Sequence, residues 1–207
     1  MRPQAAIFDI GNVLLEWNPE RAYDAAFGEA RRRAVFAAVD LHGMNLAIDA
    51  GAPFRATVYD TAGRHPAWSE EIRFWHDHWL EMAGVRIEGS IRLLRALRAG
   101  GVPVFALTNF GDDSFAFAQS RIDVLNEFDR AFVSGRMGVT KPDPAIYAAV
   151  EAETGLPPGA LLFTDDRAEN VAAAAARGWQ VHHFEGWEGW ARRLVQAGLL
   201  TPAGAGL

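Results

Sequence analysis

Short apolar runs alternate with stretches of helical spacing along most of the chain. Residues 5–8 (Ala-Ala-Ile-Phe) are apolar throughout, which is typical of a strand buried on both faces. Four later runs have the same character, and a helical pattern precedes each of them. The predicted strands are 102–107, 131–133, 161–163 and 180–184, and the predicted helices are 91–99, 113–120, 145–154 and 168–177. Such alternation predicts an α/β fold: a doubly wound parallel sheet with helices on both faces.

The segment between the first two strands has a different pattern. Residues 19–85 show apolar positions at turn spacing, such as Ala22, Ala26 and Phe27, and no run rich in β-branched residues. We therefore predict a small helical cap at 19–85, inserted after the first strand into a core formed by residues 1–18 and 86–207. At the other end, the pattern predicts a last helix over 185–197 and a loose tail over 201–207.

Composition narrows the possible partners. The 207 residues carry a net charge of −6, which disfavours nucleic acid as a partner because that binding needs an excess of Lys and Arg. Cysteine is absent, so a metal ion has to be held by oxygen or imidazole ligands. No apolar run reaches the ~20 residues that cross a bilayer. We expect a cytoplasmic protein, a monomer or homodimer, with a small-molecule ligand and no membrane or nucleic-acid partner.

Polar residues follow four of the predicted strands, where the carboxyl ends of parallel strands form one ligand-binding edge. These residues are Asp9, Thr108, Asn109, Lys141, Asp165 and Asp166. Asp9 and Asp166 can share Mg²⁺, which takes one or two protein carboxylates together with phosphate and water. Lys141 and the Thr108 hydroxyl can donate to phosphate oxygens. The pattern favours chemistry on a phosphorylated small molecule.

The same residues fall within four ordered motifs that resemble those of the haloacid dehalogenase superfamily. The matching stretches are Ile7–Leu14 (IFDIGNVL), Ala106–Asn109 (ALTN), Gly138–Pro144 (GVTKPDP) and Phe163–Val171 (FTDDRAENV). The Asp-x-Gly-Asn form at 9–12 is similar to that of the bacterial glucose-1-phosphate phosphatase-like branch. The resemblance implies a Rossmann-like core, a small helical cap, Mg²⁺ and hydrolase activity.

The resemblance also implies individual roles. Asp9 would be the nucleophile and a metal ligand, with the Gly11 carbonyl and the Asp166 carboxylate completing the protein's share of the metal site. Thr108 and Lys141 would hold the phosphoryl group, with Asn109 beside them on the substrate side. Asp165 and Asn170 would contact these groups and position them without binding the metal or the substrate themselves.

One position departs from the pattern of most phosphatases in the superfamily. They carry a second Asp two residues after the nucleophile, as a general acid, and here that position is Gly11. The loss of a general acid typically costs ~10²–10⁴ in rate, which leaves three explanations: a good leaving group, a replacement acid, or no catalysis. We favour the first, because an anomeric phosphate leaves as a hemiacetal oxygen that needs little protonation. Asn12 is the nearest polar residue, but an amide cannot deliver a proton at neutral pH.

The sequence thus favours a magnesium-dependent phosphohydrolase that forms an aspartyl-phosphate on Asp9, with a sugar phosphate such as a sugar 1-phosphate as substrate. Two alternatives stay open: a 2-haloacid dehalogenase, in which Asp9 attacks carbon, and a non-catalytic sensor of a phosphorylated ligand. In the cap we expect His42 and Asn45 to bind substrate. Trp75 and Trp79, four residues apart, are expected to share a helix face in the cap core.

Overall fold

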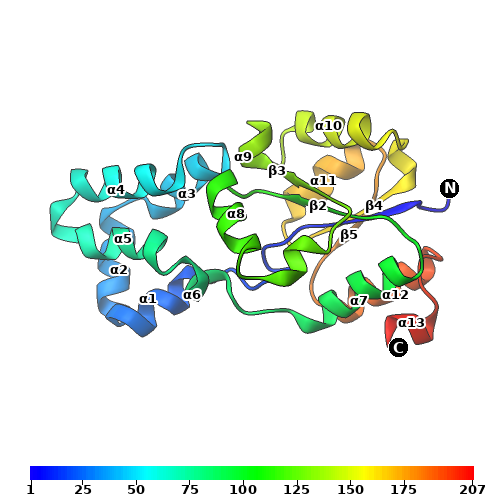
Figure 1. Cartoon of the computed structure of the whole chain (residues 1–207), viewed down its shortest axis with the longest axis horizontal. Helices are drawn as coiled ribbons and strands as arrows, with labels where there is room; N and C mark the ends of the chain where they lie inside the picture. The colour runs from blue at the N-terminus through cyan, green and yellow to red at the C-terminus, as the bar shows by residue number, and fades with distance from the viewer.

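The computed structural model describes all residues from Met1 to Leu207, and it has two parts (Figure 1). A five-stranded sheet with helices on both sides forms the core, and a group of helices projects beyond one end of the sheet. Every strand pairing is parallel, in the order β3-β2-β1-β4-β5. The strands are β1 (Ala5–Phe8), β2 (Val104–Thr108), β3 (Arg130–Val133), β4 (Leu161–Asp165) and β5 (Gln180–His183). The predicted doubly wound α/β fold is confirmed.

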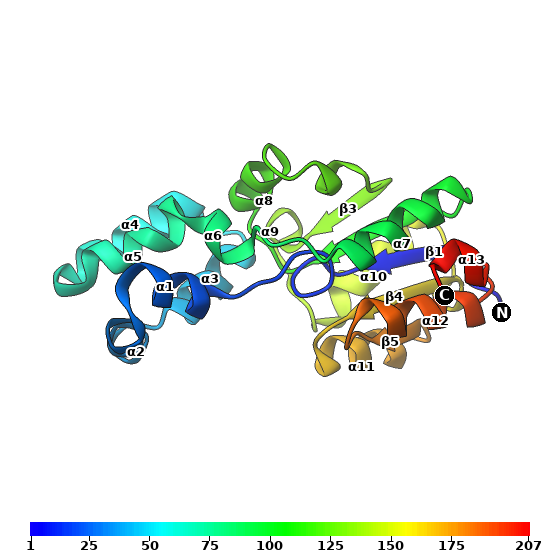
Figure 2. The same cartoon turned by 90° about the horizontal axis from the view of Figure 1, so that it is seen from below.

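The central strand β1 shows why the sheet needs cover on both faces. Its four residues are all fully buried, and alternate side chains point to opposite sides. Ala6 and Phe8 belong to the larger apolar core, whereas Ala5 and Ile7 belong to a separate cluster on the other face. Helices pack on each face of the sheet, as Figures 1 and 2 show. The core helices are α7 (Glu88–Ala99), α8 (Asp112–Gln119), α9 (Ser134–Met137), α10 (Pro144–Thr154), α11 (Ala168–Ala176), α12 (Trp187–Gln196) and α13 (Pro202–Ala205).

Six α-helices lie between β1 and α7, and we keep the name cap for residues 19–85. They are α1 (Pro19–Phe27), α2 (Glu29–Ala38), α3 (Leu41–Asp49), α4 (Phe54–Arg64), α5 (Ser69–Asp77) and α6 (Trp79–Ala83). Local signals fix several of their ends. Asn18 caps α1 by accepting from the Arg21 N–H, with Pro19 at the first helical position, and Asp40 caps α3 through the Gly43 N–H.

The two chain segments that enter and leave the cap run side by side. The Glu16 N–H donates to the Val85 carbonyl, and the Ile87 N–H donates to the Leu14 carbonyl. Leu15 also forms an antiparallel bridge with Arg86. These contacts tie both connections to one place, immediately beside the end of β1, so the cap is held over the carboxyl edge of the sheet.

Three details differ from the sequence prediction. Trp75 and Trp79 do not share one helix, because α5 ends at Asp77 and α6 begins at Trp79; both rings nevertheless lie about 6 Å from that of Trp17. The tail is not loose: Thr201 caps α13 and Ala205 is buried. Strand β2 starts at Val104 rather than at 102. No helix is both long enough and apolar enough to span a bilayer.

Candidate active site

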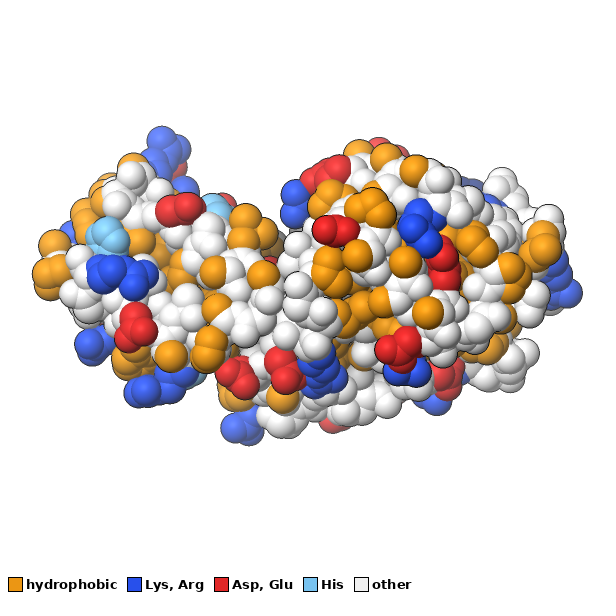
Figure 3. All heavy atoms as spheres, turned by 90° about the horizontal axis from the view of Figure 1, so that it is seen from above, with side chains coloured by type: hydrophobic (Ala, Val, Ile, Leu, Met, Phe, Trp, Pro, Cys, Tyr) orange, Lys and Arg blue, Asp and Glu red, His pale blue; other side chains and the backbone are white.

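A pocket of about 310 Å³ lies where the cap meets the carboxyl edge of the sheet. Figure 3 shows the surface hollowed between the cap and the core. The core side contributes the residues that follow β1, β2 and β4 together with Lys141, and the cap side contributes residues of α3 and α6. The polar residues predicted from sequence to bind metal or substrate all line this pocket: Asp9, Gly11, His42, Asn45, Thr108, Asn109, Lys141 and Asp166. Asn170 lines it as well, and Asp165 lies behind it.

Asp9 directly follows β1, and two neighbouring groups hold its carboxylate in place. Its Oδ1 atom accepts from the Ile10 N–H at 2.7 Å and lies 2.9 Å from Lys141 Nζ. Burial raises the pKa of Asp9 to about 7; the charge of Lys141 opposes this rise, and the carboxylates of Asp165 and Asp166 add to it. A cation close to this carboxylate would therefore strongly favour its ionised, nucleophilic form.

Lys141 is the centre of a buried network of charges. Its ammonium group lies 2.6 Å from Asp165 Oδ2 and 2.9 Å from the Leu107 carbonyl, in addition to its contact with Asp9. Burial by itself would lower the pKa of Lys141, but the adjacent carboxylates of Asp9 and Asp165 raise it above its usual value. Lys141 is therefore a fixed positive charge beside the Asp9 carboxylate.

Asp165 has no free oxygen with which to bind a ligand. Oδ2 accepts from Lys141 and, at 3.1 Å, from Asn170 Nδ2. Oδ1 accepts from the Arg167 N–H at 2.9 Å and from Asn170 Nδ2 at 2.9 Å. The side chain is fully buried. Asp165 thus contacts Lys141 on one side and Asn170 on the other, and the supporting role expected for the two residues stays a prediction.

Asp9, Asp165 and Asp166 form an acidic cluster whose carboxylate oxygens lie within 4.8 Å of one another. Because Asp165 is saturated by hydrogen bonds, Asp9 and Asp166 are the carboxylates with capacity for a cation. Burial raises the pKa of Asp166 as well. Two adjacent, partly desolvated carboxylates fit Mg²⁺, which takes hard oxygen ligands and would neutralise their repulsion. The backbone of Gly11 lies in the same pocket wall and offers a carbonyl oxygen.

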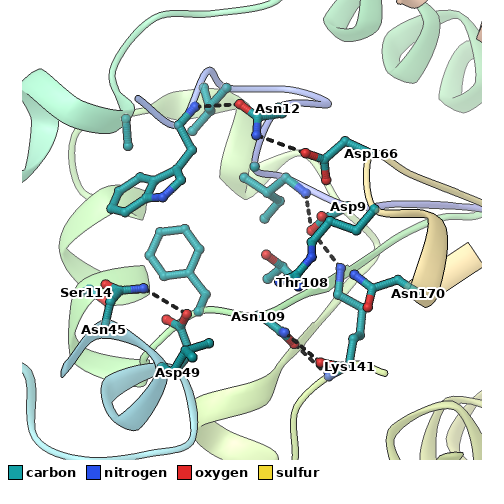
Figure 4. A pocket seen from close by; sticks show the side chains of 18 of the residues that line it. Asp9, Asn12, Asn45, Asp49, Thr108, Asn109, Ser114, Lys141, Asp166 and Asn170 are labelled. Carbon is teal, nitrogen blue, oxygen red and sulfur yellow. Dashed lines mark hydrogen bonds and ion pairs between the residues drawn. The ribbon is translucent and has the colours of Figure 1, made fainter. Parts of the chain in front are cut away.

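Asn12, the polar residue next to Gly11 in the sequence, joins Asp166 to the loop that follows β1. Its Nδ2 donates to Asp166 Oδ2 at 2.9 Å, and its Oδ1 accepts from the Trp17 N–H at 2.9 Å (Figure 4). The backbone of Asn12 is left-handed, with φ of 54°, a conformation that Asn tolerates better than most residues. Asn12 therefore positions Asp166.

Asn109 is engaged by the backbone of Lys141. Its Oδ1 accepts from the Lys141 N–H at 2.7 Å, and its Nδ2 donates to the Lys141 carbonyl at 2.9 Å. This pair of bonds fixes the loop that carries Lys141. Thr108, the last residue of β2, has a buried side chain and lies in the pocket wall beside Asp9 (Figure 4).

On the cap side, α3 presents His42, Asn45 and Asp49 to the pocket. The spacing of three and then four residues places them on one helix face. Asn45 accepts from Trp75 Nε1 at 3.1 Å and donates to Asp49 Oδ2 at 2.9 Å. His42 is exposed and lies 3.6 Å from Glu20. Sequence reasoning did not select Asp49, because nothing local marks a carboxylate at the end of a helix as buried.

The fold and the site together are those of a hydrolase with an α/β core and a helical insertion after its first strand. A family model for haloacid dehalogenase-like hydrolases matches residues 3–178, and the chain belongs to that family. The chain is 26% identical over 189 residues to a sesquiterpene phosphatase from Aspergillus oryzae, covering 84% of this chain and 86% of the relative. It is 22% identical over 206 residues to a D-ribitol-5-phosphate phosphatase from Bacteroides thetaiotaomicron, covering 91% of this chain and 95% of that one.

Solved structures give the same fold. A haloacid dehalogenase family enzyme from Bacteroides thetaiotaomicron superposes with a TM-score of 0.74 at 21% identity, covering 94% of this chain and 99% of its own. The same enzyme, solved in complex with magnesium and inorganic phosphate, superposes with a TM-score of 0.66 at 19% identity, covering 89% and 95% of the two chains. The predicted family and hydrolase class are confirmed.

Proposed function

We propose that this chain is a magnesium-dependent phosphohydrolase that acts on a small phosphorylated metabolite. The substrate that we favour is a sugar phosphate such as a sugar 1-phosphate. The observation that carries the proposal is the contact of Lys141 with Asp9, next to the carboxylate of Asp166, in the pocket between cap and core. Phosphatases among the relatives support the phosphohydrolase class. A neighbouring structure that contains magnesium and phosphate supports the choice of cofactor.

In the first step, an Asp9 carboxylate oxygen attacks phosphorus, and the bond from phosphorus to the leaving oxygen breaks. The leaving oxygen keeps the electron pair of that bond and takes a proton from solvent. Lys141 stabilises the charge of the phosphoryl oxygens, and the Thr108 hydroxyl can donate to one of them. A bound Mg²⁺, held by Asp9, Asp166 and the Gly11 carbonyl, would supply further charge neutralisation.

In the second step, water attacks phosphorus of the aspartyl-phosphate, which releases inorganic phosphate and restores the Asp9 carboxylate. Asp9 is only 7% exposed, so the site limits but does not exclude access of water. Without an acid at position 11, the first step should be fastest for leaving groups of low basicity. An anomeric phosphate satisfies this condition.

The acidic cluster also weighs against the dehalogenase alternative. Attack on carbon with loss of halide develops no charge that needs a metal, so a second unpaired carboxylate beside Asp9 would only repel an anionic haloacid. The sensor alternative needs no nucleophile, whereas Asp9 lies within contact distance of a lysine that favours its ionised form.

The test is release of inorganic phosphate from a panel of sugar 1-phosphates and 6-phosphates, with Mg²⁺ and with a chelator. We expect Mg²⁺-dependent release that favours the anomeric phosphates and is abolished by Asp9→Asn. Asp113→Asn, a change of the same type outside the pocket, serves as the control. Tight binding of a panel member without turnover would support the sensor instead, and turnover of 2-haloacids without metal would support the dehalogenase.

A further inference from the structure

The cap side of the pocket holds a carboxylate that the two chemical steps do not use. Asp49 is the last residue of α3; it lines the pocket and is 9% exposed. In Figure 4 it lies across the pocket from Asp9, Lys141 and Asp166, on the cap side. With the phosphoryl group bound at Asp9 and Lys141, as the proposed function requires, the leaving group would extend toward this side of the pocket.

The placement of Asp49 is unfavourable for the fold alone. A negative charge at the C-terminus of a helix meets the negative end of the helix dipole. Burial raises the pKa of Asp49 to about 7, and the nearby Gly111 N–H and the charge of Lys141 offset this only in part. A buried carboxylate without a contacting cation costs stability, and such departures from local rules concentrate at functional sites.

Neighbouring groups hold the Asp49 side chain in one orientation. The Trp75 indole N–H fixes the amide oxygen of Asn45, so the Asn45 NH₂ group points at Asp49 Oδ2. The Asp49 carbonyl accepts from Ser134 Oγ at 2.6 Å, which anchors the end of α3 to the core. The carboxylate keeps lone pairs free for donors from the pocket, because a carboxylate accepts about four hydrogen bonds.

We propose that Asp49 is a specificity-determining residue that accepts hydrogen bonds from hydroxyl groups of the leaving group, so that the substrate is a polyol or sugar phosphate rather than the phosphate of an apolar alcohol. The inference rests on the proposed phosphohydrolase function. His42 and Asn45 lie on the same helix face and extend this polar surface. The rest of the pocket includes apolar walls from Leu15, Trp17 and Trp79, which would tolerate an apolar group but not select hydroxyls.

The experiment compares, in each of two pairs, a hydroxylated substrate with an apolar one of similar size. We would measure kcat and KM for glucose 1-phosphate against cyclohexyl phosphate, and for ribitol 5-phosphate against n-pentyl phosphate, all with Mg²⁺. For Asp49→Ala we expect kcat/KM to fall about 10–100-fold for the hydroxylated member of each pair, as for loss of a hydrogen bond to a charged group, mostly through KM. The apolar members should change less than threefold.

Asp113→Ala is the matched control. Asp113 accepts from the Phe54 N–H at 3.3 Å across the boundary between cap and core but does not line the pocket. Its loss should therefore leave unchanged, in each pair, the ratio of kcat/KM for the hydroxylated substrate to kcat/KM for the apolar one. If Asp49→Ala does not fold, Asp49→Asn keeps the shape of the side chain and should lower the same ratios by a smaller factor.

Three results are distinguishable. A selective loss for the hydroxylated substrates supports the inference. An equal loss for both members of each pair would show that Asp49 only holds the cap on the core, and would overturn the inference while leaving the phosphohydrolase proposal intact. No phosphate release from any substrate by the unaltered enzyme would overturn the proposed function and the inference together.

Discussion

Asn12 donates a hydrogen bond from Nδ2 to Oδ2 of Asp166 at 2.9 Å and so joins the loop after β1 to the loop after β4. The two residues are 154 positions apart in the chain. The bond occupies one carboxylate oxygen of Asp166 and leaves the other for a cation shared with Asp9. The geometry of the proposed metal site therefore depends on a residue that does not bind the metal.

Removal of this bond should weaken Mg²⁺ binding. Asn12→Gly keeps the left-handed backbone without strain but loses the amide, and we expect the Mg²⁺ concentration for half-maximal activity to rise about 10–100-fold. Asn12→Ala adds backbone strain and should also lower stability by about 1 kcal/mol. An Asn12→Gly enzyme with an unchanged Mg²⁺ requirement would show that Asp166 needs no such support.

Loss of the charge on Lys141 should destabilise the fold strongly. Lys141→Met leaves Asp9 and Asp165 buried without their cation, which should lower the free energy of unfolding by about 3–5 kcal/mol. The measurement is urea unfolding at pH 7 in a chelator. Arg95→Met, which breaks the exposed pair with Glu127, is the control and should cost at most about 1 kcal/mol. Equal costs for the two variants would contradict a buried network centred on Lys141.

Gly11 has room for the side chain that most phosphatases of the superfamily carry there. A Cβ atom at this position would meet nothing closer than Trp17 Cβ, at 4.0 Å, and the backbone of Gly11 is not left-handed. Gly11→Asp should therefore fold and supply a general acid. We expect kcat/KM for glucose 6-phosphate to rise by at least ~10² relative to that for glucose 1-phosphate. An unchanged ratio would mean that position 11 does not limit the choice of leaving group.

Stability should depend on pH through Asp49. Its pKa is about 7 in the folded protein and near 3.8 when exposed, so the folded state binds the proton more tightly. The protonated Asp49 makes its full contribution to the free energy of unfolding below about pH 3.8, and this contribution is lost as the pH rises to about 7. Relative to Asp49→Asn, the free energy of unfolding of the wild-type protein should fall by up to about 1.4 kcal/mol per pH unit between these two pH values. Urea unfolding from pH 5 to 8 in a chelator checks this, with Asp113→Asn as the control; parallel curves for wild type and Asp49→Asn would contradict it.

Much of the fold follows from local patterns. The central strands β1 and β4 are buried on both faces, so their apolar runs are clear signals. The sequence prediction is wrong at element boundaries that single residues determine. Pro103 has no N–H, although its carbonyl still accepts from Ala6, and the regular strand β2 begins only at the next residue. At His78 the helical pattern continues in sequence while the backbone breaks between α5 and α6.

Some residues of the candidate site could likewise be predicted from the sequence, and others could not. The residues at strand ends could be predicted because parallel topology brings such ends to one edge. The roles of Asn12 and Asp49 depend on partners far away in the chain, Asp166 for the first and Ser134 and Gly111 for the second. No periodicity or motif specifies such pairs. The two unusual features that do mark them, a left-handed Asn and a buried carboxylate at a helix end, are visible only in three dimensions.

The central claim is that Asp9 carries the phosphoryl group between the two steps. The direct measurement is an acid-quenched single turnover with a phosphate-labelled sugar 1-phosphate and Mg²⁺, followed by borohydride reduction and peptide mass spectrometry. The account predicts labelled protein that forms and decays on the time scale of turnover, with Asp9 converted to homoserine and no label in Asp9→Asn. Turnover without any trapped phosphoryl group on Asp9, or with the label on another residue, would contradict it.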